Sequence, residues 1–377
     1  MYIVCYALNL LLALCILCYS IYMVIHLIFW LSYGKKKAEA ATLHIQISII
    51  IPARNEEDTI GPCLQSILAQ NYPIALTEIV VCDDYSEDNT KQAALKILGT
   101  TSARFKYITV ESPFGKKKAI EAGIKASSGE LIIVTDADCI AEKGWISTIV
   151  SEYEQTHANM LCGPVAIVNE ANFCEKFQAL EMCGLSLLSG AGIKSGLPLL
   201  SNAANIAYTR KAFDAVNGFQ NIDETPSGDD TLLMFKIHKK FPGTIHYIKS
   251  RAAIVYTSAQ PSWKDLFMQR IRWASKGLHS KNGLNSAVSL MVFLANILPI
   301  ICFISALFHP YFIKIVLSAL VLKALVDFLL LSFATYFFRK KELLLYFPIA
   351  VIIVMLYTSI IGLTANFVPY KWKGRNY

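Results

Sequence analysis

Three short acidic clusters lie in one stretch of the 377-residue chain: Asp83–Asp84, Asp136–Asp138 and Asp229–Asp230. The first two follow apolar, strand-like runs, where carboxylates are unfavourable unless a cation holds them. A hard divalent cation such as Mg²⁺ binds one or two carboxylates together with phosphate oxygens. The Asp-Ala-Asp sequence at 136–138 therefore predicts a site where one carboxylate meets a nucleoside hydroxyl and the other a metal ion. Capping of a helix starting at Ala141 is the alternative interpretation.

The pair Asp229–Asp230, which follows Gly228, is a candidate for general-base chemistry. A carboxylate that faces an acceptor hydroxyl takes its proton while the oxygen attacks an anomeric carbon. We expect Asp230 to be this base. Capping of the following helix by Asp229 is the simpler interpretation of that residue, and it is compatible with the role of Asp230.

A downstream segment with the sequence Gln-Arg-Ile-Arg-Trp, residues 269–273, adds cationic and aromatic groups. Arg272 is suited to neutralise charge that builds on a leaving diphosphate. Trp273 offers a flat face to a sugar ring. Taken alone, these residues and Gln269 are typical of a membrane-surface anchor, but the acidic clusters upstream favour a catalytic interpretation.

Further polar positions are candidates for holding the nucleotide. Backbone and side-chain donors after the first strand suit a nucleobase, and a glycine followed by lysine at a helix N-terminus suits a diphosphate. Ordinary helix caps and a solvated basic turn are the alternatives. The candidates are Pro52, Arg54, Asn55, Glu56, Asp83, Asp84 and Lys116.

Strands that alternate with helices should position these residues, and this alternation predicts a parallel sheet with helices on both faces. Asn55 and Ser86 are expected to cap the helices after the first two strands. Ligands bind beyond the carboxyl ends of such strands, so we expect the acidic clusters to converge there. The expected strands cover residues 45–52, 78–82, 105–110 and 130–135, with a helix over 116–127.

The second half of this region is less regular. Strand-like runs and helical patterns follow one another without a clear repeat. The segment 263–277 mixes aromatic, basic and apolar residues at helical spacing, which indicates a helix along the membrane surface. The other expected elements are strands over 160–168 and 205–208 and helices over 173–190 and 229–240.

Long apolar segments flank the region, and the mean hydropathy of +0.44 exceeds that of an ordinary soluble domain. Residues 3–33 form too long an apolar run for a signal-peptide core, so they predict a retained transmembrane helix; a cleaved signal is the alternative. Lys35–Lys37 follow it and place the central domain in the cytoplasm.

Three C-terminal segments, 287–308, 312–338 and 343–368, are long enough to cross a bilayer. The basic residues at 339–341 should face the cytoplasm. Three full crossings would then place the basic tail at 371–375 outside, against the charge rule. One segment is therefore expected to be interfacial or re-entrant.

The net charge of +7 comes from basic residues at the ends of the spans and at 116–118. This distribution favours anionic lipid or phosphate ligands and argues against nucleic acid. The ten cysteines lack zinc-site spacing and fit a cytoplasmic domain with reduced thiols.

The expected organisation is a transmembrane helix, a catalytic domain and a second transmembrane region. The catalytic domain includes an interfacial segment at its end. The expected bounds are 1–34 for the first helix, 35–285 for the cytoplasmic domain with the interfacial segment at 263–284, 286–368 for the transmembrane region and 369–377 for a basic tail.

Taken in order, these motifs resemble those of glycosyltransferase family 2, in particular its membrane-integrated members. That group includes ceramide glucosyltransferase-like enzymes, hyaluronan synthases and cellulose synthases. The resemblance covers residues 45–280, through SIIIPARNEE, VVCDDYSEDNT, GKKKAIEAGIKASSGELIIVTDAD, SGDDTLL and QRIRW. It implies an α/β GT-A fold, Rossmann-like, and an inverting transfer from a nucleoside diphosphate sugar such as a UDP-sugar that depends on Mg²⁺ or Mn²⁺.

The resemblance also implies roles by position. Asp83 or Asp84 and Asp136 should contact the nucleoside, and Asp138 the metal. Asp230 matches the catalytic base, and Gln269, Arg272 and Trp273 match the Q-x-x-R-W signature. Two departures stand out: Gly228-Asp229-Asp230 replaces the usual Glu-Asp, and the stretch Ser201-Asn202-Ala203-Ala204-Asn205 leaves the role of Asn205 open.

The chain has few spans for a synthase that conducts a polymer. This favours a single transfer to a lipid or lipid-linked acceptor by an integral membrane protein of a bacterial inner (cell) membrane. A processive polysaccharide synthase, a non-catalytic nucleotide-sensing membrane subunit and a nucleotidyltransferase are the alternatives. The last does not explain the Q-x-x-R-W segment.

Overall fold

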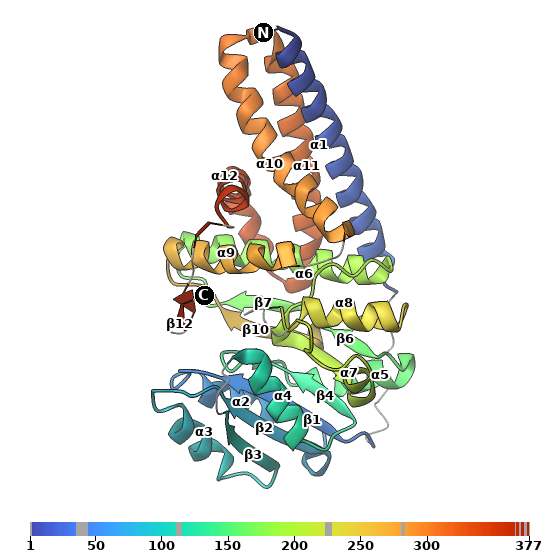
Figure 1. The fold of residues 1–377 in the computed structure, drawn as a ribbon, viewed down its shortest axis with the longest axis vertical. Coiled ribbons are helices and arrows are strands. Elements are labelled where there is room, and N and C mark those ends of the chain that lie inside the picture. The colour runs from blue at the N-terminus through green and yellow to red at the C-terminus, as the bar shows by residue number, and fades with distance from the viewer. Residues whose placement is uncertain are drawn as a thin grey trace.

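A computed structural model shows an α/β part at one end of the molecule and long apolar helices at the other (Figure 1). It describes residues 2–34, 44–110, 115–222, 228–279, 283–365, 367–368, 371–372 and 375–376. The lysines at 35–37, Ser227 and parts of the basic tail lie outside this set.

The described elements follow one another as strands and helices up to residue 279 and as helices from residue 283 to residue 364. The strands are β1 Ile47–Ala53, β2 Thr77–Asp83, β3 Arg104–Thr109, β4 Leu131–Val134, β5 Ile140–Ala141, β6 Met160–Cys162, β7 Val165–Val168, β8 Ile206–Thr209, β9 Ile245–Tyr247, β10 Val255–Ser258, β11 Lys371–Trp372 and β12 Arg375–Asn376. The α-helices are α1 Tyr2–Leu31, α2 Ile60–Leu68, α3 Thr90–Leu98, α4 Lys116–Ala126, α5 Trp145–Thr156, α6 Phe173–Lys194, α7 Arg210–Ala215, α8 Thr231–Lys240, α9 Trp263–His279, α10 Gly283–Phe308, α11 Ile313–Phe338 and α12 Phe347–Thr364. Short 3₁₀ helices are η1 Ile74–Leu76, η2 Ala203–Asn205, η3 Arg251–Ala253, η4 Pro310–Phe312 and η5 Lys341–Tyr346.

The main sheet of the described residues has seven strands in the order β3-β2-β1-β4-β8-β6-β9. β1 pairs in parallel with β2 and β4, and β2 pairs in parallel with β3. The parallel arrangement predicted for the first four alternating strands is therefore confirmed. β8, from the less regular second half, runs antiparallel to β4 and to β6, so the whole sheet is mixed. The four parallel strands still end at one edge, which brings the loops after β1, β2 and β4 together.

Burial on both sides explains why β1 is apolar along its whole length. Every residue of this strand is buried. Ile49 packs in a core that includes Leu64 of α2, and Ile50 packs in a second core that includes Ile120 of α4. Because helices cover both faces, the strand shows no alternation of polar and apolar residues.

The predicted caps at Asn55 and Ser86 are wrong. α2 begins at Ile60 after Thr59, and α3 begins at Thr90 after Asn89. Asn55 instead has a left-handed φ of 52°. The backbone N–H of Asn55 donates to the Ser86 hydroxyl at 3.0 Å, and the side-chain oxygen of Asn55 accepts from the backbone N–H of residue 87 at 2.9 Å. These bonds tie the β1–α2 loop to the β2–α3 loop at the sheet edge.

Among the described residues, four helices are long and apolar enough to cross a membrane: α1, α10, α11 and the segment made of η5 and α12. Figure 1 shows α1, α10 and α11 running together away from the α/β part, while α12 lies next to α9. α12 also packs against α10 and α11: a Cβ at Gly362 would lie 2.3 Å from the Phe293 ring, and the rings of Phe328 and Phe347 lie 5.2 Å apart. Within this bundle, Lys323 is buried and pairs with Asp327 at 2.7 Å, and Asp327 accepts from the Tyr19 hydroxyl at 2.7 Å. The buried charge is thus paired inside the bundle, as an apolar medium requires.

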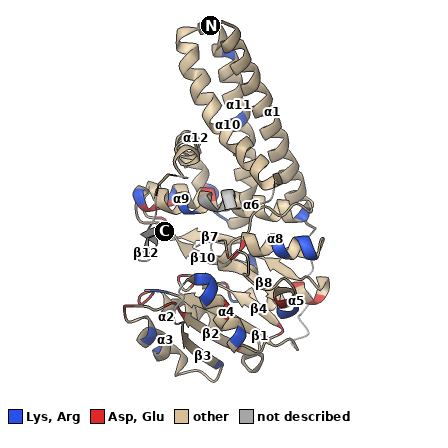
Figure 2. Cartoon of the chain, in the orientation of Figure 1, with Lys and Arg blue, Asp and Glu red and all other residues tan. Residues whose placement is uncertain are grey.

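Charged side chains are concentrated on the α/β part and on α9, and they are sparse in the bundle of apolar helices (Figure 2). α9 is amphipathic and lies between α6 and α12 at the junction of the two parts (Figure 1). This is the helix that carries Gln269, Arg272 and Trp273.

Candidate functional site

A cavity of about 700 Å³ lies beyond the carboxyl ends of β1 and β4, bounded by α6, α8 and α9. Every side chain predicted for the site lines this cavity except those of Asn55 and Asp83. Residues more than 200 positions apart, such as Pro52 and Trp273, therefore share one concave surface. Concave sites at this edge of an α/β sheet are where ligands bind.

Lys116 is at the centre of the acidic side of this cavity. Its ammonium lies 2.6 Å from a carboxylate oxygen of Asp136 and 3.1 Å from one of Asp229. Burial alone lowers the pKa of Lys116, but the two carboxylates outweigh that effect and hold its pKa raised, so the lysine stays protonated. One positive charge at the first turn of α4 thus links the end of β4 to the start of α8.

The other two lysines of this run point elsewhere. Lys117 is buried and donates to the carbonyl oxygen of Ile222. Lys118 pairs with Glu121 at 3.0 Å on the same helix. The preference for Lys116 over its neighbours as the residue that faces the cavity agrees with this geometry.

Asp138 lies two residues beyond Asp136 and also lines the cavity. The Thr257 hydroxyl lies 3.5 Å from one of its oxygens, and the Cys139 thiol lies 3.4 Å from the other. Across the described part of the chain, no group of three or more His, Cys, Asp or Glu side chains is placed to hold a metal. Mg²⁺ and similar cations use one or two carboxylates and complete their shell with phosphate oxygens and water. The oxygen donors at 136 and 138 therefore fit a hard divalent cation that binds together with a diphosphate.

Asp229 and Asp230 are both buried, but their surroundings differ. Asp229 pairs with Lys116, whereas Asp230 is the N-cap of α8 and accepts from the N–H of Thr231 at 2.6 Å. The simpler interpretation of Asp229 as the cap of this helix is therefore wrong. The turn depends on Gly228, whose φ of +88° favours glycine.

Asp84 and Asp83 also differ in position. Asp84 lines the cavity and accepts from the N–H of Gly115 at 2.9 Å, so it connects the β2 edge to the start of α4. Asp83 accepts from the N–H and hydroxyl of Ser86 within its own loop. Of these two candidates for nucleoside contact, the geometry favours Asp84.

Arg54 connects the loops around the cavity through hydrogen bonds and an ion pair. Its guanidinium donates to the carbonyl oxygen of Asp84 at 2.9 Å and to that of Tyr85, and it pairs with Glu87 at 2.9 Å. Pro52 and Glu56 line the cavity on either side of it. The β1–α2 and β2–α3 loops are thereby held as one wall.

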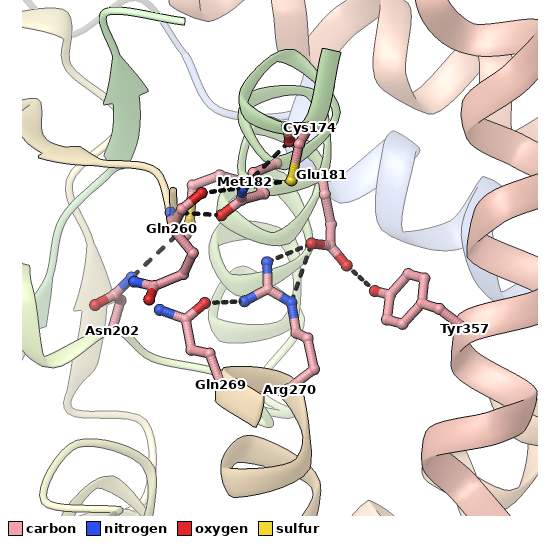
Figure 3. Close-up of polar contacts among 9 residues, drawn as sticks. Cys174, Glu181, Met182, Asn202, Gln260, Gln269, Arg270 and Tyr357 are labelled. Carbon is pink, nitrogen blue, oxygen red and sulfur yellow. Dashed lines mark hydrogen bonds and ion pairs between the residues drawn. The ribbon is translucent and has the colours of Figure 1, made fainter. Parts of the chain in front are cut away.

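Gln269 lies one helical turn before Arg272 and Trp273 on α9, and all three line the opposite wall of the cavity. The residue between them, Arg270, was not predicted to belong to the site. Its guanidinium carbon lies 4.1 Å from the ring centroid of Trp273, and its side chain donates to Gln269 (Figure 3). No local pattern singled out Arg270, because its partner Glu181 lies 89 positions away.

Asn205, whose role the sequence left open, is buried and connects several segments through its side-chain hydrogen bonds. Its side-chain oxygen accepts from the Trp145 indole N–H at 2.9 Å, and its amide donates to the carbonyl oxygens of Pro164 and Ala253 at 2.8 Å each. A Cβ at Gly163 would lie 2.4 Å from this amide. The residue thus joins β8, the β6–β7 turn and η3 behind the cavity.

We predict that Asn205→Ala lowers the free energy of unfolding by about 3 kcal/mol or more, because it leaves several buried polar groups unsatisfied. Thermal unfolding of the purified protein would measure this. Lys118→Ala, which removes a partly exposed pair on α4, serves as the control and should change stability by less than about 0.5 kcal/mol. Equal unfolding midpoints for wild type and Asn205→Ala would contradict the structural role.

The lining of the cavity also includes apolar side chains. They come from α6, α8, α9 and the loop before η2, and Asn285 and Ser289 of α10 also contribute to the lining. The apolar lining residues include Leu185, Leu199, Leu200, Phe235 and Met268. The cavity therefore extends from the acidic sheet edge to the first apolar helix after α9.

Comparison with known proteins adds family information. Residues 48–186 match the family model described as glycosyl transferase family 2, and residues 131–361, more than half of the chain, match glycosyl transferase family group 2. A probable glycosyltransferase, YdaM, of Bacillus subtilis (strain 168) is 26% identical over 61% of this chain and 54% of its own length. The chain thus spans about half the length of that relative.

A second relative aligns over a shorter stretch, and a solved structure aligns over nearly the whole chain. The Escherichia coli UDP-Glc:alpha-D-GlcNAc-diphosphoundecaprenol beta-1,3-glucosyltransferase WfgD is 32% identical over 38% of this chain and 58% of its own length. Among solved structures, the mannosyltransferase PcManGT from Pyrobaculum calidifontis, in complex with GDP-Man and Mn²⁺, aligns over 96% of this chain and 98% of its own with a TM-score of 0.58 and 17% identity. That similarity supports the fold.

Proposed function

The chain belongs to glycosyltransferase family 2, and we propose that it transfers a sugar from a nucleoside diphosphate sugar, a UDP-sugar by resemblance, to a lipid or lipid-linked acceptor. The observation that carries this proposal is the single cavity that brings together the acidic sheet edge, Asp230 and α9, and that continues to an apolar helix. The fold is the GT-A-like α/β fold of this family.

Asp138 would hold a divalent cation, Mg²⁺ or Mn²⁺, together with the diphosphate, and Asp136 beside it would contact the nucleoside. When bound, such a cation supplies Lewis-acid stabilisation of the diphosphate oxygens. PcManGT was solved with Mn²⁺, which agrees with the oxygen donors of Asp138. Asp84, from the neighbouring loop, would orient the nucleoside.

The reaction we propose is one in-line displacement with inversion at the anomeric carbon. Asp230 accepts the proton of the acceptor hydroxyl, whose oxygen forms the new bond to the anomeric carbon. The bond from that carbon to the diphosphate breaks, and its electron pair leaves with the diphosphate. Arg272 and Lys116 place positive charge beside this leaving group.

The apolar side chains in the lining of the cavity support an acceptor with a hydrocarbon part. An amphipathic acceptor would place its chain along Leu185, Leu200 and Phe235 and its hydroxyl near Asp230. The E. coli relative is named for a diphosphoundecaprenol-linked acceptor.

We further propose that the α/β part is cytoplasmic, that α1 and the C-terminal helices lie in the cell membrane, and that α9 lies at its surface. The apolar character of these helices and the charge concentration on α9 support this arrangement. The domain bounds expected from the sequence, at residues 34, 285 and 368, belong to the same proposal.

A test is to incubate membranes that contain the protein with Mn²⁺ and a panel of labelled nucleotide sugars, followed by lipid extraction and mass analysis. We expect one labelled lipid from one donor. A ladder of long chains would favour a polymerising enzyme, as in the Poly-beta-1,6-N-acetyl-D-glucosamine synthase of Staphylococcus epidermidis, which is 25% identical over 61% of this chain. Membranes with Asp138→Asn are the control, and the absence of any labelled product from wild type would overturn the proposal.

A further inference from the structure

A buried polar network connects α9 to both α6 and α12 (Figure 3). The guanidinium of Arg270 donates through Nε to a carboxylate oxygen of Glu181 at 3.1 Å and through Nη2 to the same oxygen. The other oxygen of Glu181 accepts from the hydroxyl of Tyr357. One carboxylate on α6 thus holds a cation from α9 and a phenol from an apolar helix.

Because Arg270 and Glu181 are largely buried, few orientations of the Arg270 side chain are allowed. Arg270 is 6% exposed, and the side chain of Glu181 is 14% exposed. Burial lowers the pKa of Arg270, but the charge of Glu181 outweighs it and raises that pKa, so the guanidinium remains charged. A buried charge requires its partner, and the planar guanidinium allows few orientations that satisfy it.

The orientation of Arg270 determines what Gln269 presents to the cavity. Arg270 Nη1 donates to Oε1 of Gln269 at 2.5 Å. Arginine has no acceptor, so the atom of Gln269 that faces it must be the oxygen. The amide NH₂ of Gln269, which lines the cavity, is therefore left to donate to a ligand.

Trp273 is held by the same group. The guanidinium carbon of Arg270 lies 4.1 Å from its ring centroid, within the range of a cation–π contact. Arg270 consequently touches two cavity-lining residues of α9, Gln269 before it and Trp273 after it, while its charge is paired with Glu181.

A second link holds the same segment to α6. The amide of Gln178 donates to the carbonyl oxygen of Gln260 at 2.9 Å, and the N–H of Gln260 donates back to Gln178 at 2.8 Å (Figure 3). This link precedes α9 and is made by neutral groups. It fixes where the helix starts, whereas the orientation of the cavity-facing side chains depends on Arg270.

We infer that Arg270 is a positioning residue for sugar transfer: held by Glu181 and, through it, by Tyr357 of α12, it sets the orientation of Gln269 and Trp273 in the cavity. This inference rests on the proposed function and adds to it a residue at a variable position of the Q-x-x-R-W signature. It also makes the packing of α12 a determinant of the geometry of the site.

The test uses the full-length protein in detergent, once transfer by wild type is established. Arg270→Lys keeps the charge and loses the planar fork, so we expect kcat to fall by about 10–100-fold. The Kd of UDP or GDP, whichever binds wild type, should change less than about threefold, because the residues proposed to hold the nucleoside and the cation, Asp84, Asp136 and Asp138, lie on the sheet side of the cavity. Tyr357→Phe removes one hydroxyl and should lower kcat about fivefold.

A double-mutant cycle separates positioning from folding. In the Gln269→Ala/Trp273→Ala background, Arg270→Lys should lower the residual kcat less than about twofold, because the two side chains that Arg270 positions are absent. An equal loss in both backgrounds would overturn the inference, and so would a loss that follows the fall in the thermal unfolding midpoint.

Lys340→Met is the matched control, because it breaks another part-buried ion pair, with Glu170 just before α6, that does not involve α9. It should lower the unfolding midpoint and leave kcat unchanged. A wild-type protein without transfer would refute the proposed function, whereas active wild type together with fully active Arg270→Lys would refute only the positioning role.

Discussion

Asp230→Asn will nearly abolish sugar transfer while leaving folding and nucleotide binding intact. The substitution removes the proton acceptor, and general-base catalysis contributes about 10²–10⁴-fold to such reactions. It should not destabilise α8, because asparagine caps a helix N-terminus about as well as aspartate and Asp230 is the N-cap there. We therefore expect the loss of activity to appear as a lower kcat.

This separation can be measured directly. Single-turnover transfer, the thermal unfolding midpoint and nucleotide titration on the same preparation would each report one property. Asp229→Asn is the matched comparison: its carboxylate pairs with Lys116, so we expect it to weaken binding of the metal and nucleotide more than Asp230→Asn does. Turnover near that of wild type in Asp230→Asn would reject the assignment of this residue as the base.

Asp138→Asn has the second largest expected effect. It removes a hard anionic oxygen from the proposed cation site, so activity at fixed Mn²⁺ should fall by about 100-fold or more. The loss should be partly recovered at higher Mn²⁺ concentration, because the diphosphate still supplies ligands. Initial rates measured over a range of Mn²⁺ concentrations would show this as a shift of the activation midpoint.

Thr257→Val is the control for this experiment. The Thr257 hydroxyl lies 3.5 Å from the Asp138 carboxylate, so its removal changes the surroundings of that carboxylate without removing its charge. We expect a shift of the activation midpoint smaller than about tenfold in this variant. An unchanged Mn²⁺ dependence in Asp138→Asn would exclude this residue as a metal ligand.

The structure separates residues that the motifs group together. In the acidic pair after β2, Asp84 lines the cavity and Asp83 binds its own loop. In the pair before α8, Asp229 holds Lys116 and Asp230 caps the helix. Adjacent carboxylates in a turn point in different directions, so their separate contacts depend on backbone angles that the motif does not specify.

The sequence by itself determined the α/β fold, the apolar helices and the edge at which the site lies. Buried runs such as Ile47–Ala53 and polar residues just after them are local signals, and parallel pairing then places their ends together. The same signals predicted the strand at 205–208 but did not give the direction of β8, and they failed for the caps at Asn55 and Ser86, because strand direction and loop-to-loop hydrogen bonds depend on distant partners.

Only the tertiary structure decided how α9 completes the cavity. The bonds of Glu181 to Arg270 and Tyr357 join residues 89 and 176 positions apart, and no periodicity or spacing encodes them. They form because α6, α9 and α12 pack together and leave a charge that is largely shielded from water. A buried charge requires an oppositely charged partner, and the position of that partner depends on how the whole chain folds.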